Sequence, residues 1–334
     1  MDTIKKIPLI IDTDPGDDDA ASILWALSCG KFDVKALTIA NGNVGLDKCA
    51  INALRTLEVS KRIDIPVYKG AWKPIMIPAQ DASWIHGEDG LGDAGFPLPQ
   101  KPATPGYAPV EMARIAKESP EPITILALAP TTNVALAILL DADFRNHVKE
   151  IVFMGGAVAV PGNTSPGASF NVAADPHAAS IVYNSGIPVV QVGLDACDQV
   201  TQRWGDLDEI GRAGTAVADF VVRMMEFRRD KAVKVIKNEK GEVVARIAAN
   251  EEAGRGKTGI GLNDLTTTAY LVNPGWFKVR EVTMDIETGG LTPGRTTADF
   301  HGLWGRKPNC TFAYEVDGPA LVDRWVEDIK AFRP

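Results

Sequence analysis

A run of carboxylates near the start of the chain is the feature most able to do chemistry. Its members are Asp12, Asp14, Asp17, Asp18 and Asp19. They follow the apolar run 7–11, and the carboxyl ends of strands are where open α/β sheets bind ligands. Two carboxylates about 4 Å apart repel by about 4 kcal/mol at an effective dielectric of about 20, so a converging cluster needs a cation. With no His or Cys nearby, oxygen ligands favour Ca²⁺ or Mg²⁺ over zinc.

An acidic helix start is the competing interpretation of this run. Asp in the first turn of a helix interacts well with the helix dipole, and one Asp can cap the helix. That accounts for one or two of the acids. It leaves Asp12 and Asp14, which precede the turn, without a role, so the run favours a metal site.

The elements around the run indicate an α/β fold, because short apolar runs alternate with segments of helical period. Strands are predicted at 7–12, 34–40, 123–129, 150–156 and 188–193, and helices at 21–30, 47–60, 108–118, 131–140 and 175–186. The last third adds an antiparallel edge, 280–288 and 311–317, and a closing helix, 319–332. We predict a single large domain over residues 1–334, with an open, mostly parallel sheet flanked by helices and the active site at the carboxyl ends of its strands.

Two segments break this alternation. Residues 71–106 are rich in Pro, Gly and Trp, which is typical of a long functional loop. Residues 237–257 are highly charged and contain a Lys-Gly turn, which indicates a mobile hairpin or lid, or a solvated surface excursion without a catalytic role.

Composition excludes several classes of protein. The chain has 35 Lys and Arg against 43 Asp and Glu, a net charge of -8, which disfavours nucleic acid and anionic membranes as partners. The four cysteines are far apart in sequence, as expected for reduced thiols rather than a zinc site or a disulfide framework. We see no signal peptide and no run of the ~18 apolar residues that a membrane span needs, so a soluble cytoplasmic protein is expected.

The sequence IIDTDPGDDDA resembles the DxDPGxDDA signature of the inosine-uridine preferring nucleoside hydrolase family. Further landmarks of that family follow in order: Gly42-Asn43, HGEDGLG at 86–92, APTTNVALA at 129–137, VFMGGA at 152–157, Gly162-Asn163, SFN at 169–171, Asp175-Pro176 and Asn263-Asp264. The resemblance implies calcium-dependent hydrolysis of the N-glycosidic bond of a ribonucleoside, which releases base and ribose. It also implies a homodimer or homotetramer.

The resemblance further implies roles for individual residues. The calcium ligands would be Asp14, Asp19, Asp264 and the backbone carbonyl of Leu128. Asp14 would also be the general base for the attacking water, with inversion at the anomeric carbon. The substrate contacts would be Asp18, Asn43 and Asn171 to the ribose 2′ and 3′ hydroxyls, Asn163 to the 5′ hydroxyl, and Phe170 as a wall of the pocket. Alternatively, the asparagines bridge loop backbones and Phe170 is a core residue.

Two positions depart from the family pattern. Ser169 replaces an acidic residue, which removes a charged acceptor for the 5′ hydroxyl and leaves room for a modified 5′ position. Asn263 replaces a His at the catalytic position of the leaving-group acid, and an amide can offer only a hydrogen bond. The candidates for activating the base instead are Trp84, His86, Phe227, Arg228 and Arg229. Each of these candidates also has a purely structural interpretation. His86 could pack on Trp84 as a loop residue. The helix 216–230 could bury its apolar side, with Arg228 and Arg229 interacting favourably with the helix dipole at its C-terminus.

Three alternatives remain open. A phosphatase of the haloacid dehalogenase type also begins with strand and DxD, but it needs Thr or Val where Gly16 stands. A calcium-dependent nucleoside-binding or sugar-binding protein without catalysis is consistent with Asn263, whereas Asp14 argues against it. A hydrolase of a modified N-riboside is the third.

Overall fold

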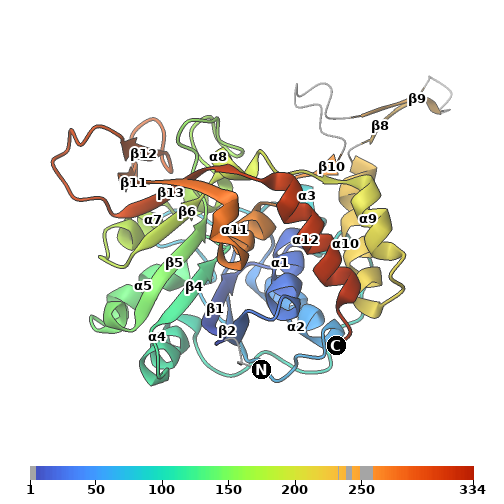
Figure 1. Ribbon diagram of the computed structural model, residues 1–334, viewed down its shortest axis with the longest axis horizontal. Coiled ribbons are helices and arrows are strands. Elements are labelled where there is room, and N and C mark those ends of the chain that lie inside the picture. Colours follow the sequence, from blue (N-terminus) through green and yellow to red (C-terminus); the bar gives the residue numbers. More distant parts are fainter. Residues whose placement is uncertain (1–4, 232, 238–242, 249–258) are drawn as a thin grey trace.

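The structure is a computed structural model that describes residues 5–231, 233–237, 243–248 and 259–334 (Figure 1). Its main sheet has nine strands in the order β12-β11-β13-β6-β5-β4-β1-β2-β3. The strands of this sheet are β1 (Ile7–Thr13), β2 (Phe32–Ile39), β3 (Val67–Lys69), β4 (Ile123–Ala127), β5 (Val148–Met154), β6 (Val189–Val192), β11 (Phe277–Ile286), β12 (Thr296–Asp299) and β13 (Cys310–Val316). Two short pairs lie outside it: β7 (Gln202–Arg203) with β10 (Gly259–Ile260), and β8 (Val233–Lys237) with β9 (Val243–Ala248).

The sheet is parallel except at one edge. β1 to β6 and β13 pair in parallel, whereas β11 is antiparallel to β13 and β12 is antiparallel to β11. The five strands predicted from sequence are confirmed, with small shifts at their ends. The predicted edge segments 280–288 and 311–317 correspond to β11 and β13, and their antiparallel pairing is confirmed. β13 also pairs in parallel with β6, and β12, which lies beyond β11, was not predicted.

Helices cover both faces of the sheet (Figure 1). One face carries α1 (Asp17–Ser28), α2 (Leu46–Val59), α8 (Leu194–Cys197), α9 (Trp204–Gly211), α10 (Ala216–Lys231), α11 (Asn263–Val272) and α12 (Gly318–Ala331). The other carries α4 (Ala108–Glu118), α5 (Thr132–Leu140) and α7 (Pro176–Tyr183). The remaining short helices are α3 (Ser83–His86), α6 (Phe170–Ala174), η1 (Phe144–Asn146) and η2 (Pro274–Trp276). This arrangement confirms the predicted single α/β domain.

The central strands are mostly apolar because both of their faces are covered. Leu9 and Ile11 of β1 pack in the core beneath α1, whereas Ile10 between them packs in the core beneath α4 and α5. Neighbouring residues of a strand point to opposite faces, so one unbroken apolar run serves two cores. The polar residues that follow such a run therefore stand at the sheet's carboxyl edge.

The long loop 71–106 connects β3 to α4 and is irregular apart from the single helical turn α3. Two backbone hydrogen bonds fasten it to the segment after β2. Asn41 N–H donates to the Ala71 carbonyl at 3.1 Å, and Ala82 N–H donates to the Asn43 carbonyl at 2.9 Å. The loop therefore lies against the carboxyl edge of the sheet, as expected for a site loop.

The predicted hairpin or lid at 237–257 is only partly described. β8 and β9 pair antiparallel, with Val233 opposite Ala248. The Lys-Gly turn and residues 249–257 lie outside the described residues, so a lid stays a prediction.

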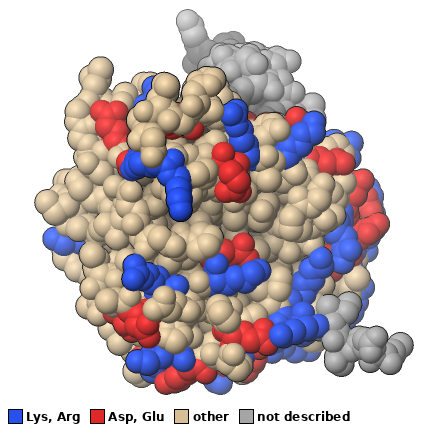
Figure 2. All heavy atoms as spheres, turned by 60° about the vertical axis from the view of Figure 1, so that its left-hand side comes forward, with Lys and Arg blue, Asp and Glu red and all other residues tan. Residues whose placement is uncertain are grey.

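The surface and thiols add two observations. On the face that Figure 2 shows, Lys and Arg lie among Asp and Glu rather than gathering in a patch of one sign. All four cysteines are free, and Cys49, Cys197 and Cys310 are buried.

Among the described residues, every helix is too short or too polar to cross a membrane.

Candidate active site

Asp14 is held at the end of β1 by the segment after β2. A side chain at Gly42 would put its Cβ 1.8 Å from Asp14 Oδ2, so only glycine allows this approach. The next residue, Asn43, donates its backbone N–H to the same oxygen at 2.7 Å. Asp14 Oδ1 is buried and has no hydrogen-bond partner among the described residues. Asp14 therefore keeps one oxygen for a ligand.

Asp19 stabilises the backbone around it in addition to lying close to the carboxylates of Asp18 and Asp264. It accepts hydrogen bonds from the Thr13 hydroxyl at 2.6 Å, from Gly16 N–H at 3.0 Å and from Asn43 Nδ2 at 2.8 Å. The bond from Gly16 caps the first turn of α1, as the helix-start interpretation requires for one acid. A carboxylate has about four lone-pair sites, so capping does not preclude metal binding.

Asp264 brings a carboxylate from the far end of the chain. It lies in the first turn of α11, and one of its oxygens is within 4.8 Å of oxygens of Asp18 and Asp19. Asp18 Oδ1 is a second buried oxygen without a hydrogen-bond partner among the described residues. Asp12 lies apart, since its Oδ1 accepts hydrogen bonds from Thr38 and Asn133.

Burial and mutual repulsion raise the pKa values of Asp14, Asp19 and Asp264. Burial, then the charge of Asp19, raises the pKa of Asp14 well above 3.8. Burial, then the charges of Asp18 and Asp19, does the same to the pKa of Asp264. The pKa of Asp19 is raised to about 6 by burial and by Asp18. Converging carboxylates with unpaired oxygens fit a hard divalent cation, which would remove this repulsion.

Asn171, on α6, connects the residue that follows β4 to the last residue of β5. Its Nδ2 donates to the Leu128 carbonyl at 2.5 Å and to the Met154 carbonyl at 3.0 Å. The predicted bridging role of Asn171 is therefore present, and Asn43 likewise bridges Asp14 and Asp19. A carbonyl oxygen has a second lone pair, so Leu128 can still serve as a ligand.

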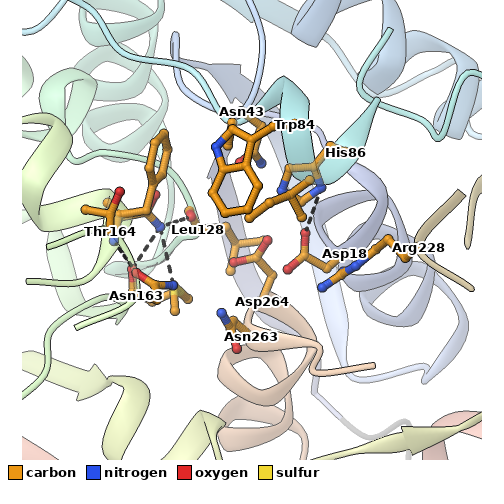
Figure 3. Close-up of a pocket in the computed structure, with 15 residues that line it drawn as sticks. Asp18, Asn43, Trp84, His86, Leu128, Asn163, Thr164, Arg228, Asn263 and Asp264 are labelled. Carbon is orange, nitrogen blue, oxygen red and sulfur yellow. Dashed lines mark hydrogen bonds and ion pairs between the residues drawn. The ribbon is translucent and has the colours of Figure 1, made fainter. Parts of the chain in front are cut away.

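The structure brings most of the predicted residues around one cavity (Figure 3). The predicted residues that line it are Asp18, Asn43, Trp84, His86, Leu128, Asn163, Phe170, Asn171, Arg228, Asn263 and Asp264. Asp14 and Asp19 are buried in contact with Asn43. Sequence reasoning missed Ala82, Ile85, Met154 and Thr164, which also line the cavity. Their only signal was adjacency to predicted residues or, for Met154, a position at the end of a predicted strand.

Ser169 and Phe227 do not line the cavity, which corrects the expectation that they face a substrate. The Ser169 side chain is fully buried, and its hydroxyl accepts the Gly156 N–H at 2.7 Å. Phe227 lies on α10 against Gly92, where an added Cβ would be 3.1 Å from Phe227 Cβ. Arg229 points to the surface and pairs with Asp208 at 2.9 Å. The short side chain of Ser169 serves the backbone beside it instead of reaching the cavity.

A basic pair lies on one side of the cavity. His86 Nδ1 lies 2.9 Å from Asp17 Oδ1, and Arg228 Nη1 lies 3.1 Å from the same oxygen. Burial favours a raised pKa for Asp17, but Arg228 and His86 outweigh it and lower that pKa. Burial favours a lowered pKa for His86, but Asp17 outweighs it and raises that pKa. His86 is therefore paired with an acid rather than serving only as packing for Trp84.

Comparisons with known proteins give this site its class. The profile of the family described as inosine-uridine preferring nucleoside hydrolase matches residues 9–323. Proteins of this class are N-glycosyl hydrolases that act on ribonucleosides. The chain belongs to this family, and it is a ribonucleoside hydrolase.

The similar proteins cover almost the whole chain. The pyrimidine-specific ribonucleoside hydrolase RihA of Salmonella typhimurium is 37% identical over 327 residues, which are 98% of this chain and 99% of that protein. RihA of Klebsiella pneumoniae is 36% identical over 318 residues, 95% of this chain and 96% of that protein. The plant nucleoside hydrolase PpNRh1 has a TM-score of 0.87 at 30% identity and covers 98% of this chain and 100% of its own. A purine-preferring ribonucleoside hydrolase from Gardnerella vaginalis has a TM-score of 0.86 at 26% identity, covering 97% of this chain and 98% of its own.

Proposed function

We propose that the chain hydrolyses ribonucleosides in a calcium-dependent reaction, with Asp14, Asp19, Asp264 and the Leu128 carbonyl as the calcium ligands. The observation that carries this proposal is the convergence of buried carboxylates from α1 and α11, together with Asp14 Oδ1, which is buried and has no hydrogen-bond partner among the described residues. All the donors are oxygens, which suits Ca²⁺ and disfavours zinc. When bound, the cation would supply a Lewis acid that engages the ribose diol and lowers the pKa of a water.

The chain's own residues would perform the remaining tasks. Asp14, with Oδ1 free, accepts the proton of the water that attacks the anomeric carbon. Asp18, Asn43 and Asn171 line the same cavity and orient the ribose 2′ and 3′ hydroxyls. Attack from the face opposite the base inverts the anomeric carbon.

Two further residues complete the proposed ribose site. Asn163 lies on the other side of the cavity from His86 (Figure 3), and we assign it to the 5′ hydroxyl as the family resemblance implies. Its Oδ1 caps α6 by accepting the Phe170 N–H at 2.9 Å, which fixes the asparagine at the cavity wall. Residue 169 is a buried serine that does not line the cavity, so this position offers the 5′ hydroxyl neither a carboxylate nor a hydroxyl partner.

The base and the setting of the enzyme are part of the same proposal. The similar RihA proteins are named pyrimidine-specific, so uridine and cytidine are the first substrates to test. The family resemblance favours a cytoplasmic homodimer or homotetramer, which light scattering on the purified chain would test.

The test is release of reducing sugar from uridine, cytidine, inosine and adenosine, with and without a chelator. We expect turnover that chelation abolishes and that Ca²⁺ restores better than Mg²⁺. Asp14→Asn should fold and reduce turnover by about two orders of magnitude or more. Asp33→Asn, at an exposed acid paired with Lys35, is the control that should retain full activity.

Other outcomes would reject the proposal in favour of another function. Release of phosphate from phosphate monoesters would indicate a phosphatase. Tight nucleoside binding without turnover would indicate the binding protein that Asn263 at the cavity leaves open. Full activity in Asp14→Asn would remove Asp14 from its role.

A further inference from the structure

Asp17 is a buried acid that the proposed mechanism does not use, and it contacts two residues that line the cavity, His86 and Arg228. It occupies the position of the signature that the family leaves variable, directly before Asp18. Its side chain is fully buried, and Oδ2 has no hydrogen-bond partner among the described residues. A buried carboxylate is costly unless it is paired. Two basic residues, His86 and Arg228, provide this pairing, and both also line the cavity.

Arg228 is the partner that carries a permanent charge to the cavity. Its Nη1 donates to Asp17 Oδ1 at 3.1 Å and its Nη2 donates to the Gly261 carbonyl at 3.0 Å. These bonds clamp the planar guanidinium between α1 and the segment before α11. They use two of the five N–H groups of an arginine, and the side chain lines the cavity. The remaining N–H groups are available to a ligand.

The position of Arg228 distinguishes two sides of the cavity. Arg228, His86 and Asp18 lie together on one side, whereas Asn163 and Thr164 lie on the other (Figure 3). Because Asn163 is assigned to the 5′ side of the ribose, the base is expected toward His86 and Arg228. The basic pair therefore faces the aglycone.

The side of the cavity that holds Arg228 is better suited to stabilising negative charge on a leaving base than to donating a proton to it. Asn263 cannot titrate, and an arginine keeps its proton at every working pH. Burial favours a lowered pKa for Arg228, but Asp17 and Asp18 outweigh it and raise that pKa further. A leaving base that takes up negative charge gains from such a cation, whereas a base that must be protonated gains nothing from it.

We infer that Asp17 is a positioning residue that holds Arg228 as a specificity-determining residue for the aglycone. Arg228 binds a carbonyl oxygen next to the glycosidic nitrogen, and this selects ribonucleosides of 2-oxopyrimidines. This inference rests on the proposed hydrolysis of ribonucleosides and deepens it. Purines carry no carbonyl beside their glycosidic nitrogen, so they gain no such contact.

The step balances without a further reactant. The water oxygen bonds to the anomeric carbon as the bond from that carbon to the base nitrogen breaks. The electron pair of the broken bond leaves with the base, and its charge spreads onto the oxygen that faces Arg228. The proton of the water goes to Asp14, and the base anion then takes a proton from solvent.

The experiment compares the kinetics of variants on substrates whose leaving groups differ in how much stabilisation they need in order to depart. The variants are Arg228→Met, Arg228→Lys and Asp17→Asn, with Arg229→Met as the matched control on the same helix. The substrates are uridine, inosine and 4-nitrophenyl β-ribofuranoside, whose phenolate leaves without assistance. Calcium is saturating, and kcat and KM are measured separately.

We expect Arg228→Met to lower kcat on uridine by about 10- to 100-fold, the size of a lost bond to a charged group. Activity on inosine and on the nitrophenyl riboside should change by less than about threefold, since neither leaving group uses this contact. Arg228→Lys should retain part of the kcat on uridine that Arg228→Met loses, because lysine keeps the positive charge but lacks the planar set of N–H donors of a guanidinium. Asp17→Asn should show the same split between substrates as Arg228→Met, and Arg229→Met should match the wild type.

Two results would overturn the inference. An equal fall on uridine and on the nitrophenyl riboside would show that Asp17 and Arg228 only support the structure of the site. Unchanged turnover of uridine in Arg228→Met would show that the base does not engage Arg228. The wild-type chain separates these failures from failure of the proposed function, which would appear as no chelator-sensitive turnover of any substrate.

Discussion

The side-chain amide of Asn171 donates to the backbone carbonyl of Leu128 at 2.5 Å. A residue expected to hold the ribose is thereby joined to a backbone oxygen expected to hold the metal. The same amide donates to the Met154 carbonyl, so one side chain fixes the ends of two neighbouring strands, β4 and β5. The proposed metal site and the proposed ribose site are therefore joined by one side chain.

Asn171→Ala should weaken calcium binding as well as catalysis. The variant leaves the Leu128 and Met154 carbonyls without their donor, and loss of a group that orients a metal ligand typically lowers affinity about 10-fold or more. The measurement is a calcium titration of activity. Asn184→Ala, which removes a surface bond to the Ser180 carbonyl, is the control. Unaltered calcium dependence in Asn171→Ala would separate the two sites.

Trp84→Ala should raise KM without affecting folding. Trp84 lines the cavity while remaining 65% exposed, so it contributes little to the folded core. Losing one aromatic contact to a base should raise KM about three- to tenfold. The free energy of unfolding should change by less than about 0.5 kcal/mol, as for most surface substitutions.

Trp72→Ala provides the comparison for this prediction, because Trp72 is 68% exposed on the same loop and does not line the cavity. Denaturant unfolding and steady-state kinetics on both variants give the two quantities. An equal KM for both variants would place Trp84 outside the substrate contacts.

The metal-free protein should lose stability as the pH rises. Burial raises the pKa of Asp12 from 3.8 to about 7, and burial and Asp18 raise the pKa of Asp19 to about 6. Between about pH 4 and pH 7 the folded chain therefore binds more protons than the unfolded chain, so the free energy of unfolding falls with rising pH. His86, whose pKa is also raised, acts in the same direction, because its stabilisation is lost as the pH rises through its folded pKa.

Urea denaturation with a chelator, at several pH values in this window, checks the trend. Asp12→Asn should reduce the dependence of the free energy of unfolding on pH. The amide can keep the hydrogen bonds that Asp12 accepts from Thr38 and Asn133, and it has no charge to bury. Saturating calcium should counteract the loss of stability at higher pH, since the ion binds ionised carboxylates. A free energy of unfolding that increases with pH in the metal-free protein would contradict the cited pKa shifts.

The fold was predictable because its strongest signals are local. The buried runs of β1, β4 and β5 are apolar on both faces, which identifies them as central parallel strands. β13 was harder to place. The sequence of β13 carries no local signal for its neighbour in the sheet, so its parallel pairing with β6 could be seen only in the structure.

The site was predictable where a motif names each residue, as at Asp14, Asp18 and Asp19. The burial of Ser169 was not, because whether a short hydroxyl faces a cavity or a backbone N–H depends on the turn around Gly156. The pairing of Asp17 with Arg228 joins residues 211 positions apart, and neither residue carries a local signal for the other.

Calorimetry of calcium binding to the wild type and to Asp264→Asn would show whether carboxylates from both ends of the chain hold one ion. Asp264 is the carboxylate that α11 adds to those of α1. We expect one calcium ion per chain in the wild type, binding that is about 100-fold weaker or undetectable in Asp264→Asn, and wild-type binding in Asp33→Asn. Equal calcium binding by the wild type and Asp264→Asn would contradict this expectation.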